Sequence, residues 1–455
     1  MVVNSMSYAT YERYKDSGVD WLGAIPSDWD LVPLKAIFRF RNEKNNPVIT
    51  ENILSLSIAK GVTGYDDENR GGNKRKDDIT AYKIARPNDI VLNSMNVIVG
   101  AVGVSKYFGA ISPVYYALYA FNDLGYVPYF NWIFQNTGFQ KGLLKYGKGI
   151  LIKLGEEGKM NTIRMKISQD DLKVLQFPLP NFEKQTKIAN FLDQKTAQID
   201  QAIALKQQQI EKLNEYKQIV IQNAVTKGLN PNAPMKNSGV EWIGDIPEHW
   251  NVIRFRNAFR FNKGLNITKE NLNDEQGILC LNYGEIHSKY GFEFIPNVHP
   301  LKFVDESYLK NNQKSLLNDG DFVFADTSED IEGSGNFSYI NGQDLVFAGY
   351  HTLIAKPNIN FNSRFIAYVL DSSAFRNQVR VRVKGVKVFS ITQAILKTTF
   401  VWLPTEQEQN EIVKYLDEQM QKFNNAKIAY QTQIDRLKEY KNILINQAVT
   451  GKIKI

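Results

Sequence analysis

The sequence has one cysteine, Cys280, and no apolar run of the about 18 residues that a membrane-spanning helix needs. A single cysteine cannot form an internal disulfide, which excludes the disulfide-stabilised secreted scaffolds. The first residues, MVVNSMSYATYERYK, lack the basic start, apolar core and small-residue cleavage site of a secretory signal. We therefore expect a cytoplasmic protein with no membrane partner.

Catalytic motifs are equally scarce. Residues 142–149, GLLKYGKG, approach a P-loop, but Gly149 stands where the Mg²⁺-binding hydroxyl should be, and VGAVG (99–103) does not fit the dinucleotide fingerprint. The four histidines form no H-x-x-x-H pair, so no zinc site is expected. One loop gathers four acids, but their spacing fits no metal motif and a solvated loop is favoured: Asp326, Glu329, Asp330 and Glu332. The sequence predicts a non-enzymatic chain that binds no cofactor or metal.

Composition and charge leave several functions open. The 455 residues suffice for two to four domains, and 43% hydrophobic with 12% aromatic residues fits folded globular protein. The net charge is +7, which permits a polyanionic partner without establishing one.

Two internal repeats organise the chain. KDSGVDWLGAIPSDW (15–29) and KNSGVEWIGDIPEHW (236–250) share nine of fifteen residues, and residues 179–226 match 403–450 without gaps at 19 of 48 positions. Such self-similarity indicates a tandem duplication. We expect four segments: a head at 1–180, a helix at 181–228, a second head at 229–403 and a second helix at 404–455.

The two long segments lack internal proline and glycine and carry an apolar stripe that repeats every seven residues, which is typical of a coiled coil. The alternative is an ordinary amphipathic helix packed on its own domain. We expect an α+β protein in which two mixed, strand-rich domains are joined by two helices that form an antiparallel coiled coil, with pseudo-twofold symmetry. The expected seam residues are Leu192, Ile199, Ile203, Ile210, Leu213, Val220, Leu416, Phe423, Tyr430, Ile434, Leu437 and Leu444.

The heads share a frame and differ in their loops. DIVL (89–92) matches DFVF (321–324), and VYYALYAF (114–121) matches GYHTLIAK (349–356), whereas the segments between them differ in length and chemistry. This pattern indicates one scaffold that presents two different recognition surfaces.

Both heads contain basic stretches that suit phosphate contacts. In VRVRVKG (379–385) the alternation predicts a strand with Arg380, Arg382 and Lys384 on one face. The alternative is a solvated strand face whose charges prevent edge pairing. The expected phosphate contacts are Arg70, Lys74, Arg75, Lys76, Lys141, Lys145, Lys148, Arg376, Arg380, Arg382, Lys384 and Lys387.

The doubled SGV-[DE]-W-[LI]-G-x-I-P-x-x-W openings, the LP…Q…I…[FY]LD helix starts and the L-x-EYK…AVT helix ends resemble the specificity subunit of type I restriction–modification enzymes. The resemblance covers nearly the whole chain. It implies two target-recognition domains on one DNA duplex, a gap set by the helices, and assembly with two modification (methyltransferase) and two restriction (translocase–nuclease) subunits. S-adenosylmethionine, ATP and Mg²⁺ would act in those partners.

Under this resemblance the repeated tryptophans, Trp21, Trp29, Trp242 and Trp250, are expected to seat each head at a helix end. Base readout is expected in the diverged loops, because short polar side chains can bond base edges in the major groove. The candidates are Asn93, Ser94, Asn96, Tyr115, Tyr116, Asp326, Thr327, Ser328, Tyr350 and His351.

Two other interpretations remain open: a DNA-targeting subunit of a related defence system, and a coiled-coil adaptor that binds only protein. Binding to DNA that weakens with salt would distinguish the adaptor from the other two.

Overall fold

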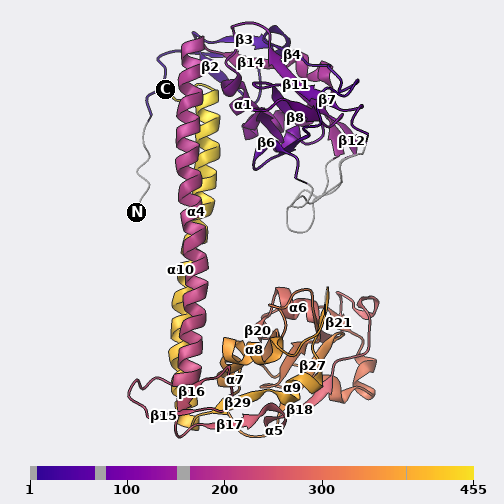
Figure 1. The fold of residues 1–455 in the computed structure, drawn as a ribbon, viewed down its shortest axis with the longest axis vertical. Helices are drawn as coiled ribbons and strands as arrows, with labels where there is room; N and C mark the ends of the chain where they lie inside the picture. The colour runs from indigo at the N-terminus through magenta and orange to yellow at the C-terminus, as the bar shows by residue number, and fades with distance from the viewer. Residues whose placement is uncertain (1–7, 67–77, 151–163, 386) are drawn as a thin grey trace. The chain divides into compact units, whose positions relative to one another are not determined.

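The computed structural model describes residues 8–66, 78–150, 164–385 and 387–455 and divides into two compact units (Figure 1). The first unit comprises residues 1–207 and 431–455, and the second comprises residues 208–430. Each unit contains one head together with parts of the two long helices, α4 (Phe182–Lys227) and α10 (Glu406–Val449). No helix in the described ranges is long and apolar enough to cross a membrane.

The long helices begin and end on local signals. Asn181 caps α4 by accepting a hydrogen bond from the Lys184 N–H at 2.9 Å, and Thr405 and Glu408 form a reciprocal capping box at the start of α10. Gly228 and Gly451 follow the helices with φ of +73° and +69°, a conformation that favours glycine and ends a helix. These signals explain why both helices were predictable from the chain.

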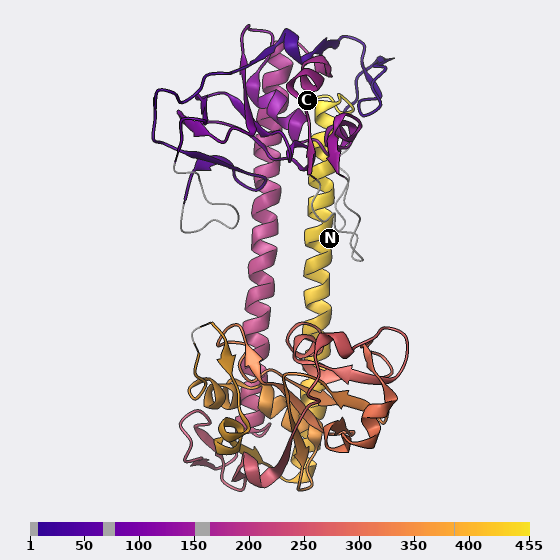
Figure 2. The same ribbon diagram turned by 90° about the vertical axis from the view of Figure 1, so that its right-hand side faces the viewer.

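Within each unit α4 and α10 run antiparallel and side by side (Figure 2). In the first unit Lys441 Nζ lies 2.7 Å from both carboxylate oxygens of Asp200, and in the second the rings of Tyr216 and Phe423 meet edge to face at 5.7 Å. Seven of the expected seam residues are buried: Leu192, Ile199, Ile210, Leu416, Phe423, Ile434 and Leu444. The other five are half-buried: Ile203, Leu213, Val220, Tyr430 and Leu437.

The first head is built around a four-stranded antiparallel sheet with the order β4-β11-β8-β9. These strands are β4 (Phe38–Phe40), β8 (Ile90–Asn93), β9 (Val102–Val104) and β11 (Tyr115–Ala120). Antiparallel pairs accompany the sheet: β1 (Tyr14–Asp16) with β2 (Ala24–Pro26), β3 (Asp30–Pro33) with β14 (Gln176–Leu179), β5 (Leu54–Ser57) with β6 (Gly61–Gly64), β7 (Lys83–Ala85) with β10 (Gly109–Ile111), and β12 (Lys148–Ile150) with β13 (Arg164–Lys166). Its helices are α1 (Val127–Gln135), α2 (Thr137–Leu143) and α3 (Gln169–Val174), with short 3₁₀ turns η1 (Leu34–Ala36), η2 (Val97–Val99) and η3 (Leu144–Tyr146).

The second head repeats this frame and enlarges it. Its main sheet has the order β18-β27-β23-β25-β20, formed by β18 (Phe259–Lys263), β20 (Phe292–Phe294), β23 (Phe322–Ala325), β25 (Phe337–Ile340) and β27 (Thr352–Pro357). A second sheet has the order β21-β19-β26-β22, formed by β19 (Ile278–Leu281), β21 (Phe303–Val304), β22 (Leu316–Leu317) and β26 (Val346–Ala348). The remaining pairs are β15 (Met235–Asn237) with β16 (Asp245–Pro247), β17 (Asn251–Arg254) with β29 (Phe400–Leu403), and β24 (Thr327–Ser328) with β28 (Phe389–Ser390).

The helices of the second head are α5 (Phe255–Ala258), α6 (Tyr283–Ser288), α7 (Ser363–Asp371), α8 (Ser373–Arg380) and α9 (Gln393–Thr398). Its 3₁₀ turns are η4 (Lys269–Asn271), η5 (Glu306–Lys310) and η6 (Gln313–Ser315). The matched sequence frame appears as matched pairing, because β8 pairs with β11 in the first head and β23 pairs with β27 in the second.

One expectation about this head is wrong. Residues 379–385 do not form a strand with three cations on one face, since Val379 and Arg380 end α8 and the chain then turns. The Ser372 side chain caps this helix, and the buried residues Phe375 and Val379 lie four apart, as a packed helix requires. Burial of Phe375 and Val379 on one face of α8 therefore outweighs the strand preference of the alternating valines and basic residues.

Each head packs on one helix start and one helix end. Trp29 is fully buried with residues from the start of α4 and the end of α10, such as Ile188 and Leu444. Trp250 is fully buried with residues from the end of α4 and the start of α10, the opposite combination of helix ends. These two tryptophans seat the heads as expected, whereas Trp21 is half-buried and Trp242 is 37% exposed.

Candidate nucleic-acid interface

The second head contains a recess of about 800 Å³ where α6, β24, the 329–336 loop and the turn at His351 converge. It collects side chains that can accept or donate hydrogen bonds, together with aromatic rings. Its lining is Tyr283, Gly284, His287, Thr327, Ser328, Glu329, Asp330, Glu332, Gly333, Asn336, His351 and Val388. Thr327, Ser328 and His351 were expected at a readout surface, and the fold brings them together.

A hydrogen-bond chain fixes one wall of the recess. Asn336 Nδ2 donates to His287 Nδ1 at 2.9 Å, so His287 Nε2 carries the proton that it donates to the Thr327 carbonyl at 2.8 Å. Arg376 donates to Asn336 Oδ1 at 2.7 Å and to Asp371 at 2.9 Å. Arg376 was expected to contact DNA phosphate. Its guanidinium instead bonds to residues of its own head and holds Asn336 in place.

His351 also lines the recess, and Asp326, which is not part of the lining, holds it in place. His351 has a φ of +54°, which is uncommon for a residue other than glycine, and its Nδ1 lies 3.1 Å from Asp326 Oδ1. Asp326 is also held through its backbone, where its N–H donates to the His351 carbonyl at 3.0 Å. The His351 side chain is 56% exposed, and the Tyr283 ring meets it edge to face at 5.3 Å. Tyr350 is half-buried behind the same tyrosine, with ring centroids 5.6 Å apart.

The residues expected to read bases in the first head are mostly internal. Ser94 is fully buried and donates to the Val114 carbonyl at 2.8 Å, while Tyr115 and Tyr116 are each only 7% exposed. Asn93 is 9% exposed and accepts a bond from the Met95 N–H at 3.0 Å. Of the five, Asn96 alone has an exposed side chain. Asn93, Ser94, Tyr115 and Tyr116 are buried where β8 pairs with β11. They stabilise this pairing, whereas they were expected to contact bases.

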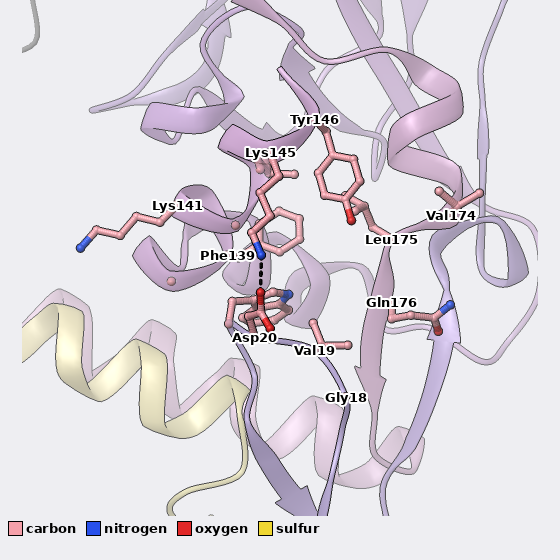
Figure 3. Close-up of a pocket in the computed structure, with 14 residues that line it drawn as sticks. Gly18, Val19, Asp20, Phe139, Lys141, Lys145, Tyr146, Val174, Leu175 and Gln176 are labelled. Carbon is pink, nitrogen blue, oxygen red and sulfur yellow. Dashed lines mark hydrogen bonds and ion pairs between the residues drawn. The ribbon is translucent and has the colours of Figure 1, made fainter. Parts of the chain in front are cut away.

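The expected phosphate contacts divide into three groups. Exposed cations are Lys141, Lys148, Lys384 and Lys387, and the last lies beside Val388 at the recess. Besides Arg376, three others have partners within the chain: Lys145 pairs with Asp20 (Figure 3), Arg380 with Glu332 at 3.0 Å, and Arg382 with the Gln378 carbonyl at 2.5 Å. Arg70, Lys74, Arg75 and Lys76 lie outside the described residues.

Sequence reasoning missed three residues of the recess, Tyr283, His287 and Asn336, because no motif marks them. Their signal was composition alone: YGEIH (283–287) places an aromatic ring and a histidine four apart, on one face of a helix. Among the described residues no group of three or more histidine, cysteine or acidic side chains could hold a metal ion. Burial raises the pKa of the Cys280 thiol to about 12, so this cysteine stays protonated and behaves as a core residue.

Comparison with known proteins agrees with this architecture. Residues 247–434 match the family model described as type I restriction modification DNA specificity domain. The type I restriction enzyme MjaVIII specificity subunit of Methanocaldococcus jannaschii is 26% identical over 284 residues, which cover 62% of this chain and 63% of that subunit. The MjaX specificity subunit from the same organism is 25% identical over 453 residues, covering 95% of this chain and 96% of its own.

A solved structure described as the structural basis of complex assembly and conformational transition of the type I R-M system has the same fold, with a TM-score of 0.67. It is 14% identical in sequence and covers 93% of this chain and 98% of its own. The family match, the similarity of the whole chain to the MjaX subunit and the shared fold agree with one another. Over nearly its whole length the chain is similar to type I restriction–modification specificity subunits, and residues 247–434 match the DNA specificity domain of that family.

Proposed function

We propose that this chain reads a bipartite DNA target for a type I restriction–modification complex, with one half-site for each head. Partner modification subunits would methylate adenine within the target, and restriction subunits would cleave unmodified DNA. S-adenosylmethionine, ATP and Mg²⁺ would be used by those partners.

The observation that carries the proposal is the equivalent seating of two different heads. Gln185 at the start of α4 and Gln409 at the start of α10 each accept a backbone N–H from their own head, at 2.7 and 2.8 Å. At the helix ends, Asn446 accepts from Asn136 in the first head, and Gln222 accepts from Ser373 in the second. Equivalent seating supports docking of two copies of one partner, since a repeated frame offers each copy the same surface.

The second head supplies the chemistry for direct readout. The recess presents carboxylate, hydroxyl, imidazole and amide groups, which bond base edges. Lys387, next to Val388 of the lining, and Lys384 are exposed and can meet phosphates. The hydrogen-bonded wall formed by His287, Asn336 and Arg376 holds the donors and acceptors in fixed directions, as specific readout requires.

The test is a map of modified adenines. The chain would be expressed with its modification subunit in an unmethylated host, and methylation would be located by single-molecule sequencing. We expect a split, asymmetric motif with a constant gap. Asp326→Ala with His351→Ala should relax one half of the motif, because each well-placed base contact contributes about 1–3 kcal/mol of discrimination.

Asn96→Ala, in the first head, is the matched variant and should affect only the other half. Absence of methylation with the wild-type chain, together with absence of salt-dependent DNA binding, would overturn the proposal in favour of a protein-binding adaptor.

A further inference from the structure

The strand register shows which residues of the two heads occupy matching positions. In the first head the Ser94 N–H donates to the Val114 carbonyl at 3.4 Å, and in the second the Asp326 N–H donates to the His351 carbonyl at 3.0 Å. Val114 therefore takes the place of His351, and β11 aligns with β27 two residues away from the match of their sequences. We call each pair, together with the loop that begins at its first residue, the corner of its head.

The two corners differ in chemistry. The loop from β8 to β9 reads SMNVIVGA (94–101) and contains no acid, whereas the loop from β23 to β25 reads DTSEDIEGSGN (326–336) and contains four. In the first head Val99 and Val114 are 44% and 41% exposed. The first corner is therefore apolar, and the second is acidic.

One acid of the second corner is available to a ligand. Asp330 accepts a bond from the Gly333 N–H at 2.6 Å, and Glu332 pairs with Arg380 at 3.0 Å. Glu329 lines the same recess, is exposed, and has no hydrogen-bond or ion-pair partner in the part of the chain that the structure describes. Its carboxylate can therefore accept bonds from a bound molecule.

In the first head lysines supply the opposite charge. Lys83 Nζ donates to the Tyr115 carbonyl at 2.9 Å and lies 5.1 Å from the centre of the Tyr116 ring, which holds the ammonium beside the residue after Val114. An ammonium has three N–H donors, so two remain for a ligand. Burial, followed by the charge of the exposed Lys166 on β13, lowers the pKa of Lys83, as expected for neighbouring ammonium groups.

We propose that the two corners read bases of opposite hydrogen-bonding character in the major groove. In the first head Lys83, with Lys166 beside it, donates to a keto oxygen, O6 of guanine or O4 of thymine. In the second head Glu329 accepts from an exocyclic amine, N6 of adenine or N4 of cytosine. The inference rests on the proposed function, since it assumes that each head meets one half-site.

Charge makes each choice selective. Lysine bonds the oxygen edge of guanine, and a carboxylate bonds the amine of cytosine, because these edges present the matching acceptor or donor. A carboxylate repels a keto oxygen, and an ammonium has no acceptor for an amine, so each corner also rejects the bases that the other reads. The exposed Val114 adds an apolar surface that suits the methyl group of thymine.

The experiment measures binding of the full-length chain, assembled with its modification subunit, to duplexes that carry the mapped motif. Base analogues that lack one keto oxygen or one exocyclic amine replace one base at a time. In the half-site of the first head, loss of one oxygen should weaken binding by about tenfold, and this sensitivity should disappear in Lys83→Met but persist in Lys83→Arg. In the other half-site, loss of one amine should weaken binding by about tenfold in the wild-type chain and not in Glu329→Ala.

Matched variants in each head control for charge alone. Lys106 is exposed at the other end of β8, where the Asn88 N–H donates to the Ser105 carbonyl at 2.8 Å, so Lys106→Met should keep the oxygen sensitivity. Glu306 is exposed and outside the recess, so Glu306→Ala should keep the amine sensitivity. Uracil in place of thymine removes the methyl group that Val114 would meet, and weaker binding there identifies thymine rather than guanine as the base.

Three outcomes separate the inference from the proposed function. Lys166→Met changes an exposed side chain on which the fold does not depend, and it should reduce the oxygen sensitivity by a smaller factor than Lys83→Met. If Lys83→Met or Glu329→Ala keeps the wild-type sensitivity, the inference is overturned while the proposed function stands, because a bipartite motif is still bound. A wild-type chain with no methylated motif and no salt-dependent DNA binding would overturn the proposed function, and the inference with it.

Discussion

The start of α4 in the first unit and the start of α10 in the second solve the same packing problem with related residues. Gln185 and Gln409, 224 positions apart, are both buried and bond to the backbone of their own heads. Eight residues later on each helix, Asp193 accepts a hydrogen bond from the Trp132 indole at 2.9 Å, and Asp417 accepts from Arg364 and Tyr368 at 2.9 and 2.6 Å. The aspartate is the same at this position of both helices, whereas the head residues that bond to it differ.

The heads differ most in their sheets and loops. The second head has an additional four-stranded sheet and the recess beside α6, whereas in the first head the matching ends of β8 and β11 are internal. The comparison teaches that duplication constrains the seating of a head and leaves its outer loops free to vary. This is the division expected when recognition loops stand on a rigid scaffold.

The largest effect should come from the tryptophans that seat the heads. Trp29→Ala and Trp250→Ala each remove a fully buried ring shared by a head and two helix ends, and each should cost about 3–5 kcal/mol of stability. Urea unfolding of the full-length protein measures this cost. Losses below about 1 kcal/mol would mean that the heads do not depend on the helix ends for their cores.

The glutamines at the two helix starts, Gln185 and Gln409, should give the next largest loss of stability. Gln185→Ala leaves the Tyr126 N–H and the Leu124 and Pro180 carbonyls without their partner, and should cost about 2 kcal/mol. Gln409→Ala removes two bonds and should cost somewhat less. The exposed Gln201→Ala on α4 is the control and should change thermal stability little. Equal, negligible shifts for all three variants would contradict a seating role for the glutamines.

A smaller effect is expected from a pair in which the acidic residue lies on the head in one unit and on the helix in the other. Asp28 pairs with Lys184 in the first unit, and His249 pairs with Glu408 in the second at 2.9 Å. Lys184→Glu would face Asp28 with a like charge and should cost at most about 1 kcal/mol, because the pair is partly solvated. Adding Asp28→His, which copies the pair of the second unit, should restore thermal stability. Failure of this restoration would show that the two sites are not equivalent.

The smallest effect is the pH dependence of these carboxylates. The hydrogen bond from Lys184 lowers the pKa of Asp28; burial opposes ionisation of Glu408, but bonds from His249 and Thr405 outweigh it and lower its pKa too. A carboxylate whose pKa is lowered by folding stabilises the fold above its unfolded value, near pH 4, and this contribution is lost as the pH falls through the folded pKa. Glu408→Gln should therefore flatten the fall in thermal stability below about pH 4. If Glu408→Gln and the wild-type chain lose thermal stability equally below about pH 4, the pair of Glu408 with His249 does not contribute to stability.

Much of the candidate interface could not be predicted residue by residue. Asn93, Ser94 and Asn96 are polar residues at the end of β8 and just beyond it, and only the packing of β8 against β11 decides that Asn96 faces solvent. The recess of the second head is formed by α6, β24 and the turn at His351, and that turn lies more than sixty positions after α6 in the chain. Such convergence depends on sheet order, which no local pattern in the chain encodes.

The sequence by itself determined the duplicated plan, the two helices and their heptad stripe, because caps, glycine ends and seven-residue spacing act over a few residues. It also marked the four repeated tryptophans as residues that join head to helix, and of these Trp29 and Trp250 are fully buried there. Only the tertiary structure decided that 373–380 is a helix, that Trp242 faces solvent while Trp21 rests on Phe139, and that Arg376 supports Asn336. These outcomes depend on which distant segment packs beside each side chain, and burial against that neighbour outweighs local preference.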